Sequence, residues 1–243
     1  MGVVCEIGTQ TRLEERRAMP GDLQLHGHPR FRDRREAGAA LADALAAYQE
    51  VDPVVLGIPR GGVPVAAEVA HRLGAELDII VARKIGFPGE PEFAIGAVSA
   101  NGGTFLDEDI IQAAGVSKLY LEAAIARECA EARRREGLYR GDRPAQVPED
   151  RVVIVVDDGL ATGATMWAAV RSVRKHEPSK VVVAVPVGSR KACEMLDHQA
   201  NDVVCVVLLG PSMAVGAYYE YFDQVSDAEV MSILAASRVS RAA

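Results

Sequence analysis

The chain has 243 residues, of which 49% are hydrophobic and 25% are charged, a composition typical of globular proteins and unlike that of disordered or fibrous chains. Its 27 basic and 34 acidic residues give a net charge of −7, which argues against a binder of nucleic acid or of anionic membranes. We therefore expect no nucleic-acid partner and no membrane partner. A site for an anion must be built locally.

Cysteine usage and the N-terminal residues indicate a reducing compartment. The four cysteines are widely spaced and form no CxxC pair, so we expect neither a zinc site nor a disulfide framework. The first residues lack the apolar run of a signal peptide, and the apolar stretch 203–209 is too short to span a bilayer. A cytoplasmic protein is the expectation.

The start of the chain differs from the rest in its patterning. Residues 1–30 show little hydrophobic periodicity, and we interpret them as an irregular extension before one domain over 31–243. From Asp33 to about Tyr48, alanines and leucines recur at helical spacing and predict a helix.

Short β-branched runs then alternate with helical segments. The expected buried strands are 54–58, 79–81, 152–156, 181–185 and 203–208. The expected helices between them are 63–73, 165–175 and 190–198. This alternation predicts an α/β fold with a mainly parallel sheet and helices on both faces.

A different pattern separates the second and third of these strands. Asn101-Gly102-Gly103 lies between the apolar stretches 94–100 and 104–106, which predicts a hairpin beside or above the main sheet. Ser117 is then expected to cap a long helix that runs to about Gly137.

The loop after the third strand carries the chemistry. Two adjacent carboxylates, Asp157 and Asp158, end a strand, and a loop rich in glycine and threonine leads into a helix. Unpaired amides at a helix start favour a phosphate, and two carboxylates suit vicinal sugar hydroxyls, with or without Mg²⁺ nearby. The pattern predicts a sugar-phosphate site. The expected substrate-binding residues of the loop are Gly159, Leu160, Ala161, Thr162, Gly163, Ala164 and Thr165.

Residues 152–165 closely resemble the phosphoribosyl pyrophosphate (PRPP) motif of type I phosphoribosyltransferases. The resemblance implies transfer of ribose 5-phosphate from PRPP to a nitrogenous base or amine acceptor, with release of pyrophosphate. It also implies a Mg²⁺ cofactor, with Asp157 and Asp158 as catalytic residues and metal ligands, directly or through water. A homodimer is the assembly that the family suggests.

Other segments occupy positions that match the family. Arg60, Gly61 and Gly62 resemble its pyrophosphate loop, in which a non-proline cis peptide would fall at Arg60-Gly61, and Lys84 matches a catalytic cation at a strand end. Read without the family, residues 60–62 fit a glycine turn that opens a helix about equally well, and Arg83-Lys84 is more often a solvated charged pair.

Two longer segments have counterparts in the family as well. Residues 85–107 resemble the mobile lid that closes over PRPP, although a plain surface hairpin is the alternative. Residues 210–223 occupy the place of the hood that holds the acceptor, although their aromatic residues also suit a hydrophobic cluster or a dimer contact.

The acceptor is narrowed by one departure from the family pattern. Members that act on 6-oxopurines commonly carry an aspartate where this chain has Ala161, and a methyl group cannot exchange a proton. We expect the acceptor not to be a 6-oxopurine. Glu92, Glu220 and Asp223 stay unassigned as candidate acids or bases.

Two other functions are compatible with these residues. A PRPP-binding regulator without turnover would keep the phosphate loop, and a Mg²⁺-dependent phosphoryl-transfer or receiver-like domain would use Asp157 and Asp158 as an acidic pocket. For an enzyme, we expect Asp158→Asn to weaken turnover with little effect on folding.

Overall fold

The computed structural model describes residues 31–141 and 150–239, and its centre is a parallel sheet of five strands in the order β2-β1-β6-β7-β8. The strands are β1 (Val54–Gly57), β2 (Glu76–Ile79), β6 (Val152–Val156), β7 (Lys180–Gly188) and β8 (Asp202–Leu208). β1 and β6 are neighbours in register, with Val54 opposite Val153. The loops that follow these two strands therefore leave the same edge of the sheet side by side.

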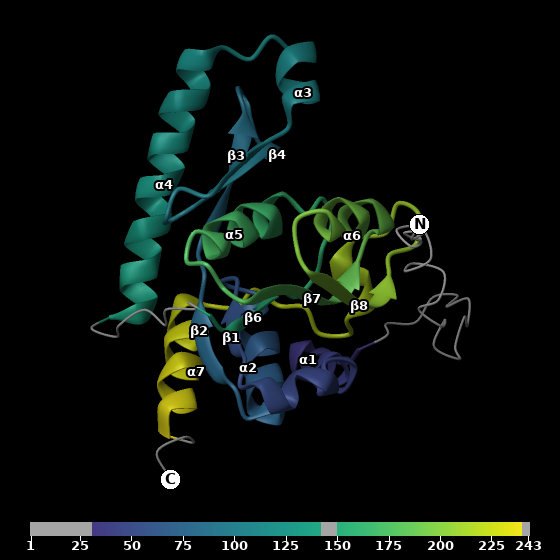
Figure 1. Cartoon of the computed structure of the whole chain (residues 1–243). Helices are drawn as coiled ribbons and strands as arrows, with labels where there is room; N and C mark the ends of the chain where they lie inside the picture. Colours follow the sequence, from purple (N-terminus) through teal and green to yellow (C-terminus); the bar gives the residue numbers. More distant parts are fainter. Residues whose placement is uncertain (1–30, 142–149, 240–243) are drawn as a thin grey trace, which may run out of the picture.

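Helices cover both faces of this sheet (Figure 1). They are α1 (Arg34–Ala44), α2 (Gly62–Leu73), α5 (Ala164–Arg174), α6 (Arg190–Asp197) and α7 (Asp227–Val239). In β6, Ile154 and Val156 pack with α1, α2 and α7, whereas Val153 and Val155 pack with α5 and α6. Because both faces are buried, the strands are apolar at successive positions, which confirms the predicted α/β class.

A second, antiparallel sheet lies above the first and consists of β3 (Ala82–Phe87), β4 (Glu90–Ser99) and β5 (Thr104–Leu106). The predicted hairpin at Asn101-Gly102-Gly103 is confirmed as the β4–β5 turn. The helices α3 (Glu108–Ala113) and α4 (Lys118–Arg140) cover it, and Ile85 and Ile95 of the sheet are buried against Ile111 of α3 in one cluster. The segment expected as a lid is thus mostly strand with a small core of its own.

Three expected element boundaries differ from the structure, the first being the helix expected to reach Tyr48, which ends at Ala44 and is followed by a 3₁₀ helix. The second strand is Glu76–Ile79 and not 79–81, because the charged residues Glu76 and Asp78 hid a strand at the sheet edge, where Asp78 pairs with Arg140 of α4. Helix α4 begins as predicted after Ser117, whose hydroxyl accepts from the Tyr120 N–H at 3.2 Å, but it continues past Gly137. The residues around Asp78 do not reveal that its ion-pair partner, Arg140, lies more than sixty residues further along the chain.

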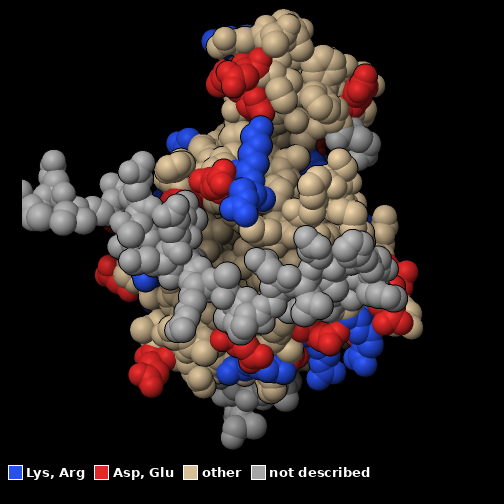
Figure 2. All heavy atoms as spheres, turned by 90° about the vertical axis from the view of Figure 1, so that its right-hand side faces the viewer, with Lys and Arg blue, Asp and Glu red and all other residues tan. Residues whose placement is uncertain are grey.

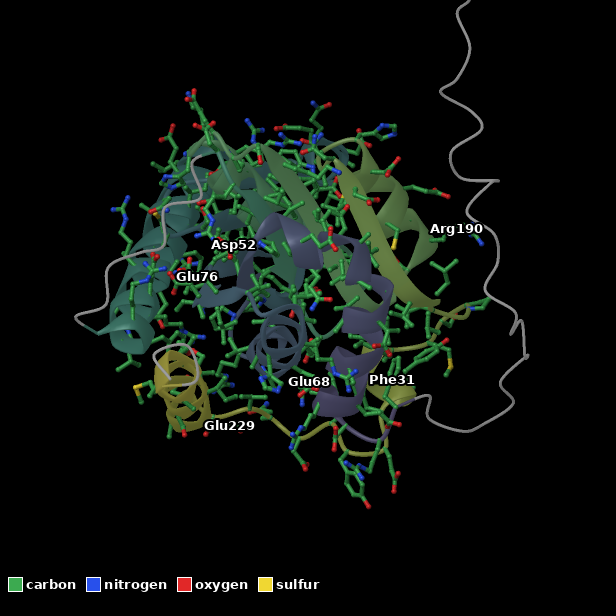
Figure 3. The ribbon with its side chains drawn as sticks, turned by 60° about the horizontal axis from the view of Figure 1, so that its bottom comes forward. Phe31, Asp52, Glu68, Glu76, Arg190 and Glu229 are labelled. Carbon is green, nitrogen blue, oxygen red and sulfur yellow. The ribbon has the colours of Figure 1, made fainter. Side chains whose placement is uncertain are left out.

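The segment after β8 returns to the start of the described chain through the short helix η2 (Val215–Tyr218). The Phe31 N–H donates to the Tyr218 carbonyl at 2.9 Å, and the Phe31 carbonyl accepts from the Glu220 N–H at 2.9 Å. Figure 3 shows Phe31 at the beginning of α1, beside this yellow C-terminal segment. The expected hood therefore holds the N-terminal end of α1. The predicted extension over 1–30 lies outside the described residues.

A short 3₁₀ helix, η1 (Ala46–Val51), completes the described elements after α1. Among residues 31–141 and 150–239, no helix combines the length and the apolar character that crossing a bilayer requires.

The contact between α1 and α2 positions the N-terminal end of α1, and Gly38 makes it possible. A Cβ on Gly38 would lie 2.8 Å from Glu68 Cβ and 2.9 Å from the Val65 carbonyl oxygen. We expect Gly38→Ala to lower the free energy of unfolding by about 1–2 kcal/mol, because the carbonyl cannot move aside.

Gly137→Ala is the matched control, since a Cβ on this exposed α4 glycine would meet nothing within 4 Å. It should raise the free energy of unfolding by up to about 1 kcal/mol through helix propensity alone. Urea denaturation of both variants measures the two effects, and a Gly38→Ala variant as stable as the wild type would show that α1 can shift freely.

Candidate active site

The loops after β1 and β6 are in direct contact. The Ile58 N–H donates to the Val156 carbonyl at 2.9 Å, which continues the pairing of the two strands. A Cβ on Gly61 would lie 1.9 Å from Asp158 Oδ2, and one on Gly62 would lie 2.8 Å from Asp157 Cα. Only glycine fits at either position. The structure thus brings together two loops that sequence analysis assigned to one site.

A non-proline cis peptide is present in the first of these loops. It joins Pro59 to Arg60, one residue before the Arg60-Gly61 bond at which the family resemblance placed it. The Gly62 N–H donates to the Ile58 carbonyl at 3.0 Å and is therefore engaged within the turn.

Asp158 is held by Arg34, a residue that sequence analysis did not single out. Arg34 Nε donates to Asp158 Oδ2 at 2.8 Å, and the two side chains are only 13% and 17% exposed. Arg34 Nη1 also donates to the Asp223 carbonyl at 2.8 Å. This ion pair gives Asp158 a structural role, so loss of its charge would also affect folding, unlike the expectation from sequence.

Aromatic residues of the hood enclose this ion pair. The Arg34 guanidinium lies 4.0 Å from the centre of the Phe222 ring, which stacks on Tyr219 at 4.8 Å. The Tyr219 hydroxyl donates to the Asp158 carbonyl at 2.6 Å, and burial raises the pKa of Tyr219, which keeps this donor protonated. Tyr219 is buried against Phe31, whereas Phe222 is exposed. These aromatics therefore build the wall of the site.

Asp157 has a different environment from its neighbour. Its Oδ1 accepts from the Asp158 N–H at 2.8 Å, and its side chain lies at the end of a buried strand. Burial and then the negative charge of Asp158 raise the pKa of Asp157 well above its usual value. Such a carboxylate is stabilised by a hydroxyl donor or a cation.

The loop after Asp158 is joined to the end of β7. The Leu160 N–H donates to the Val187 carbonyl at 2.9 Å, and the Ser189 N–H donates to the Leu160 carbonyl at 2.8 Å. The Ser189 hydroxyl donates to the Ala161 carbonyl at 2.7 Å. Ser189, another residue that sequence analysis missed, thus holds the loop. Its only sequence signal is its position before a helix, which many serines share.

Helix α5 begins directly after this loop. Gly163 is its N-cap with a φ of 81°, and the Trp167 N–H makes the first intrahelical bond, to the Gly163 carbonyl at 2.8 Å. The amides of the preceding residues have no intrahelical acceptor, which is the arrangement that binds anions at helix starts. Thr162 is exposed and Thr165 is partly exposed beside them.

Three loop residues serve packing more directly than ligand contact. A Cβ on Gly159 would lie 2.2 Å from Val215 Cγ1, and one on Gly163 would lie 2.6 Å from Met195 Cε. Leu160 is buried, and its N–H is already engaged with β7. Leu160 therefore offers no free amide, and the amides at the start of α5, within residues 161–166, stay the candidate donors for a phosphate.

The two expected cations lie at the margin of the site. Arg60 Nη1 is 3.7 Å from Asp227 Oδ1 at the start of α7, with the Arg60 side chain 37% exposed. Lys84 is exposed within β3, opposite Ala97, and not in a loop after β2. It shares a face of β3 with Ala82, which packs toward α5, so Lys84 points to the α5 side of the hairpin.

The side chains at the site would supply only part of the coordination shell of a Mg²⁺ ion. No group of three or more metal-binding side chains occurs within the described ranges 31–141 and 150–239. Asp157 is a carboxylate whose charge is opposed by burial and by its neighbour, and a cation would relieve both. The residues present therefore fit a Mg²⁺ ion that takes its other ligands from water and from substrate oxygens.

Charged side chains of both signs are interspersed on one face of the molecule. On the face drawn in Figure 2, basic and acidic side chains of the described residues lie in small mixed groups and form no continuous basic surface. At the loops after β1 and β6, the groups available to attract an anion are backbone amides and single cations.

The raised pKa of Asp157 predicts a pH-dependent effect on stability. A carboxyl whose pKa is raised by folding opposes folding when it is ionised, so Asp157→Asn should raise the free energy of unfolding at pH 7. The advantage of the variant should shrink as the pH falls through the raised pKa toward the usual value of 3.8, because the wild-type carboxyl then becomes neutral.

Urea denaturation between neutral and acidic pH measures this difference. Asp43→Asn, at an α1 carboxylate whose side chain is 75% exposed, is the control and should change stability by less than about 0.5 kcal/mol. A constant gap between Asp157→Asn and the wild type across the pH range would contradict the raised pKa.

Comparison with known proteins agrees with this geometry. Residues 24–218 match the family model described as the phosphoribosyl transferase domain. Two proteins of Mycobacterium tuberculosis, from strains CDC 1551 / Oshkosh and ATCC 25618 / H37Rv, are named "Putative phosphoribosyl transferase" and are 41% identical to this chain over 204 residues. The match covers 84% of this chain and 46% of each relative, so the chain spans about half the length of these curated relatives.

A solved structure covers nearly the same part of the chain. The protein TT1426 from Thermus thermophilus is 49% identical, with a TM-score of 0.72, over 84% of this chain and 97% of that one. Because the family model covers most of the residues and this relative shares both fold and sequence, the chain belongs to the phosphoribosyl transferase domain family.

Proposed function

We propose that this chain transfers ribose 5-phosphate from PRPP to a nitrogenous acceptor and releases pyrophosphate. The observation that carries the proposal is the β6–α5 loop, which places two carboxylates and the amides of a helix start at the same sheet edge. Membership of the phosphoribosyl transferase domain family supports it.

The 5-phosphate is assigned to the start of α5. The amides of residues 161–166 and the hydroxyls of Thr162 and Thr165 are the donors, and the bonds of Ser189 and Leu160 to this loop hold them in place before the ligand arrives. This anchor is remote from the bond that breaks, so its binding energy orients the sugar.

The ribose hydroxyls are assigned to the two carboxylates. Arg34 offsets the charge of the Asp158 carboxylate and holds this carboxylate in place. Asp157 is then the carboxylate that a hydrogen-bond donor of the ligand would stabilise. A ribose hydroxyl would satisfy it, and the negative charge would stabilise the positive sugar ring of an oxocarbenium-like transition state.

Pyrophosphate is assigned to the loop after β1 and to the hairpin above it. The backbone at Arg60 and Gly61 lies against Asp158, and the Arg60 side chain can leave Asp227, since an exposed ion pair at 3.7 Å contributes little. Lys84 would approach from the hairpin, and closure of the hairpin over PRPP would exclude water from the reacting carbon. Gly62 supports the turn through its bond to Ile58.

Mg²⁺ fits this arrangement through Asp157, with Asp158 nearby, directly or through water. When bound, it would supply charge neutralisation for the pyrophosphate leaving group. Arg34 keeps the Asp158 carboxylate oriented, which leaves Asp157 to face the ion or a water molecule bound to it.

The acceptor is assigned to the space under the hood, next to Ala161. The Ala161 carbonyl is already bonded to Ser189, and its methyl group can neither donate nor accept a proton. Adenine-like bases and amines thus fit better than hypoxanthine or guanine. Of the unassigned acids, Glu220 is exposed, the Asp223 carbonyl binds Arg34, and the Glu92 side chain lies outside the described residues.

The proposal is tested by incubation of the purified chain with PRPP, Mg²⁺ and a panel of nitrogenous bases and amines, with pyrophosphate release as the readout. Release with at least one acceptor that is not a 6-oxopurine is expected. Release with hypoxanthine or guanine alone would contradict the role of Ala161. Calorimetric binding of PRPP without any release would identify a regulator instead of an enzyme.

Asp157→Asn tests the carboxylate at the reacting sugar. Because this variant should be at least as stable as the wild type at pH 7, a loss of activity cannot be ascribed to unfolding. We expect kcat/KM to fall by about 100-fold, a typical effect of removing one electrostatic contact in a transition state. Asp43→Asn should keep the wild-type rate, and equal rates for the two variants would remove Asp157 from the reaction.

A further inference from the structure

Two cysteines that lie apart in the sequence meet beside the candidate site. Cys193 is in α6 and Cys205 is in β8, and neither forms a disulfide. A Cβ on Gly188, at the end of β7, would lie 3.0 Å from Cys193 Sγ and 3.1 Å from Cys205 Sγ. Both sulfur atoms therefore pack over the same glycine, and both residues are partly exposed.

The two thiols differ in reactivity. The Cys205 thiol lowers the pKa of Cys193, and Arg190 in the same helical turn lowers it further, while burial and Glu194 act in the opposite direction. The Cys193 sulfur and burial raise the pKa of Cys205, whose thiol donates to the Val207 carbonyl at 3.2 Å. Figure 3 shows Arg190 at the outer edge of the molecule, where a small oxidant can approach. Cys193 is thus the nucleophile of the pair, and Cys205 is its neutral partner.

The helix that carries Cys193 is packed on the phosphate loop. A Cβ on Gly163 would lie 3.3 Å from Ala192 Cβ and 2.6 Å from Met195 Cε, so residues on both sides of Cys193 touch the loop. Ser189, which caps α6 by accepting from the Ala192 N–H at 3.2 Å, also holds the Ala161 carbonyl. A movement of α6 would therefore move the loop.

The strand that carries Cys205, β8, is held more firmly than helix α6. It pairs with β7 from Asp202 to Leu208, with Cys205 opposite Val185. A disulfide requires an S–S distance of about 2.05 Å, which is shorter than any non-bonded contact. Because β8 is held along its length and α6 has eight residues, α6 would make most of the movement.

We propose that Cys193 and Cys205 form a reversible disulfide when the chain meets a peroxide, and that the disulfide displaces α6 and weakens the grip of the loop on phosphate. The Cys193 thiolate attacks one oxygen of hydrogen peroxide and breaks the O–O bond, which leaves a Cys193 sulfenic acid and a hydroxide that takes up the proton lost by the thiol to become water. The Cys205 thiol then attacks the Cys193 sulfur, its proton passes to the departing hydroxyl group, and a second water leaves. Two thiols and one hydrogen peroxide become one disulfide and two waters.

Mass spectrometry of the peroxide-treated full chain tests disulfide formation. The sequence has no Lys or Arg between Cys193 and Cys205, so cleavage before Asp197 and Asp202 is needed to separate the two cysteines. We expect these two fragments to stay joined, with a mass lower by the two thiol hydrogens, and to separate after a thiol reductant is added. Joining of either cysteine to Cys5 or Cys129, or two thiols that stay unmodified, would overturn the proposal.

Single variants assign the order of the two steps. In Cys205→Ser, Cys193 should stop at the sulfenic acid, which a cyclic diketone traps. In Cys193→Ser, Cys205 should react at most about a tenth as fast with peroxide, because burial still raises its pKa after the contribution of the Cys193 sulfur is removed. Cys129→Ser is the matched control and should form the disulfide at the wild-type rate. Equal trapping at Cys205 and Cys193 would contradict the assignment.

The effect on phosphate binding rests on the proposed function and has its own readout. Calorimetry with PRPP and Mg²⁺ should show about tenfold weaker binding to the oxidised wild type than to the reduced one, within the usual range of coupling between sites. Peroxide should not change PRPP binding by Cys205→Ser. If the mapped disulfide forms and PRPP binding is unchanged, the coupling is overturned. If the reduced chain binds no PRPP, the proposed function fails, while the disulfide mapping still decides the thiol pair.

Discussion

Two carboxylates that follow one another at the end of a buried strand repel each other, and the site depends on how this repulsion is offset. Arg34 binds Asp158 at 2.8 Å and brings together three distant segments: the start of α1, the end of β6 and the hood at Asp223. Asp157 receives no comparable partner among the described residues and has a raised pKa as a result of burial and of its charged neighbour. Asp158 is thus held by an ion pair, whereas Asp157 is free to interact with a bound ligand.

Contacts with neighbouring elements also hold the phosphate loop in place. Its first half is bonded to β7 through Leu160 and Ser189, and its second half rests on α6 through Gly163. Such bonds prepare the amides for an anion before binding, which reduces the entropy that binding would otherwise cost. These contacts also mean that a movement of α6 would move the loop. The proposed disulfide between Cys193 and Cys205 would cause such a movement.

Much of the fold and part of the site could be predicted from local patterns. The apolar runs at β1, β6, β7 and β8 predicted buried parallel strands, and the Asn101-Gly102-Gly103 turn predicted the hairpin. The β6–α5 loop was found because its carboxylates, glycines and threonines are adjacent in the chain. The strand at Glu76–Ile79 and the strand around Lys84 were missed, because charged residues at an edge or on a hairpin do not show the apolar pattern of a central strand.

By itself, the sequence determined the α/β class, the parallel strands and the loop that marks the family, since each of these depends on residues a few positions apart. The pairing of Arg34 with Asp158, the close packing of Gly61 on the same carboxylate and the approach of Cys193 to Cys205 over Gly188 follow from the folded arrangement. These contacts depend on the order of strands in the sheet and on how the helices pack across it. Hydrophobic periodicity records which side of an element is buried, but it does not record which partner buries it.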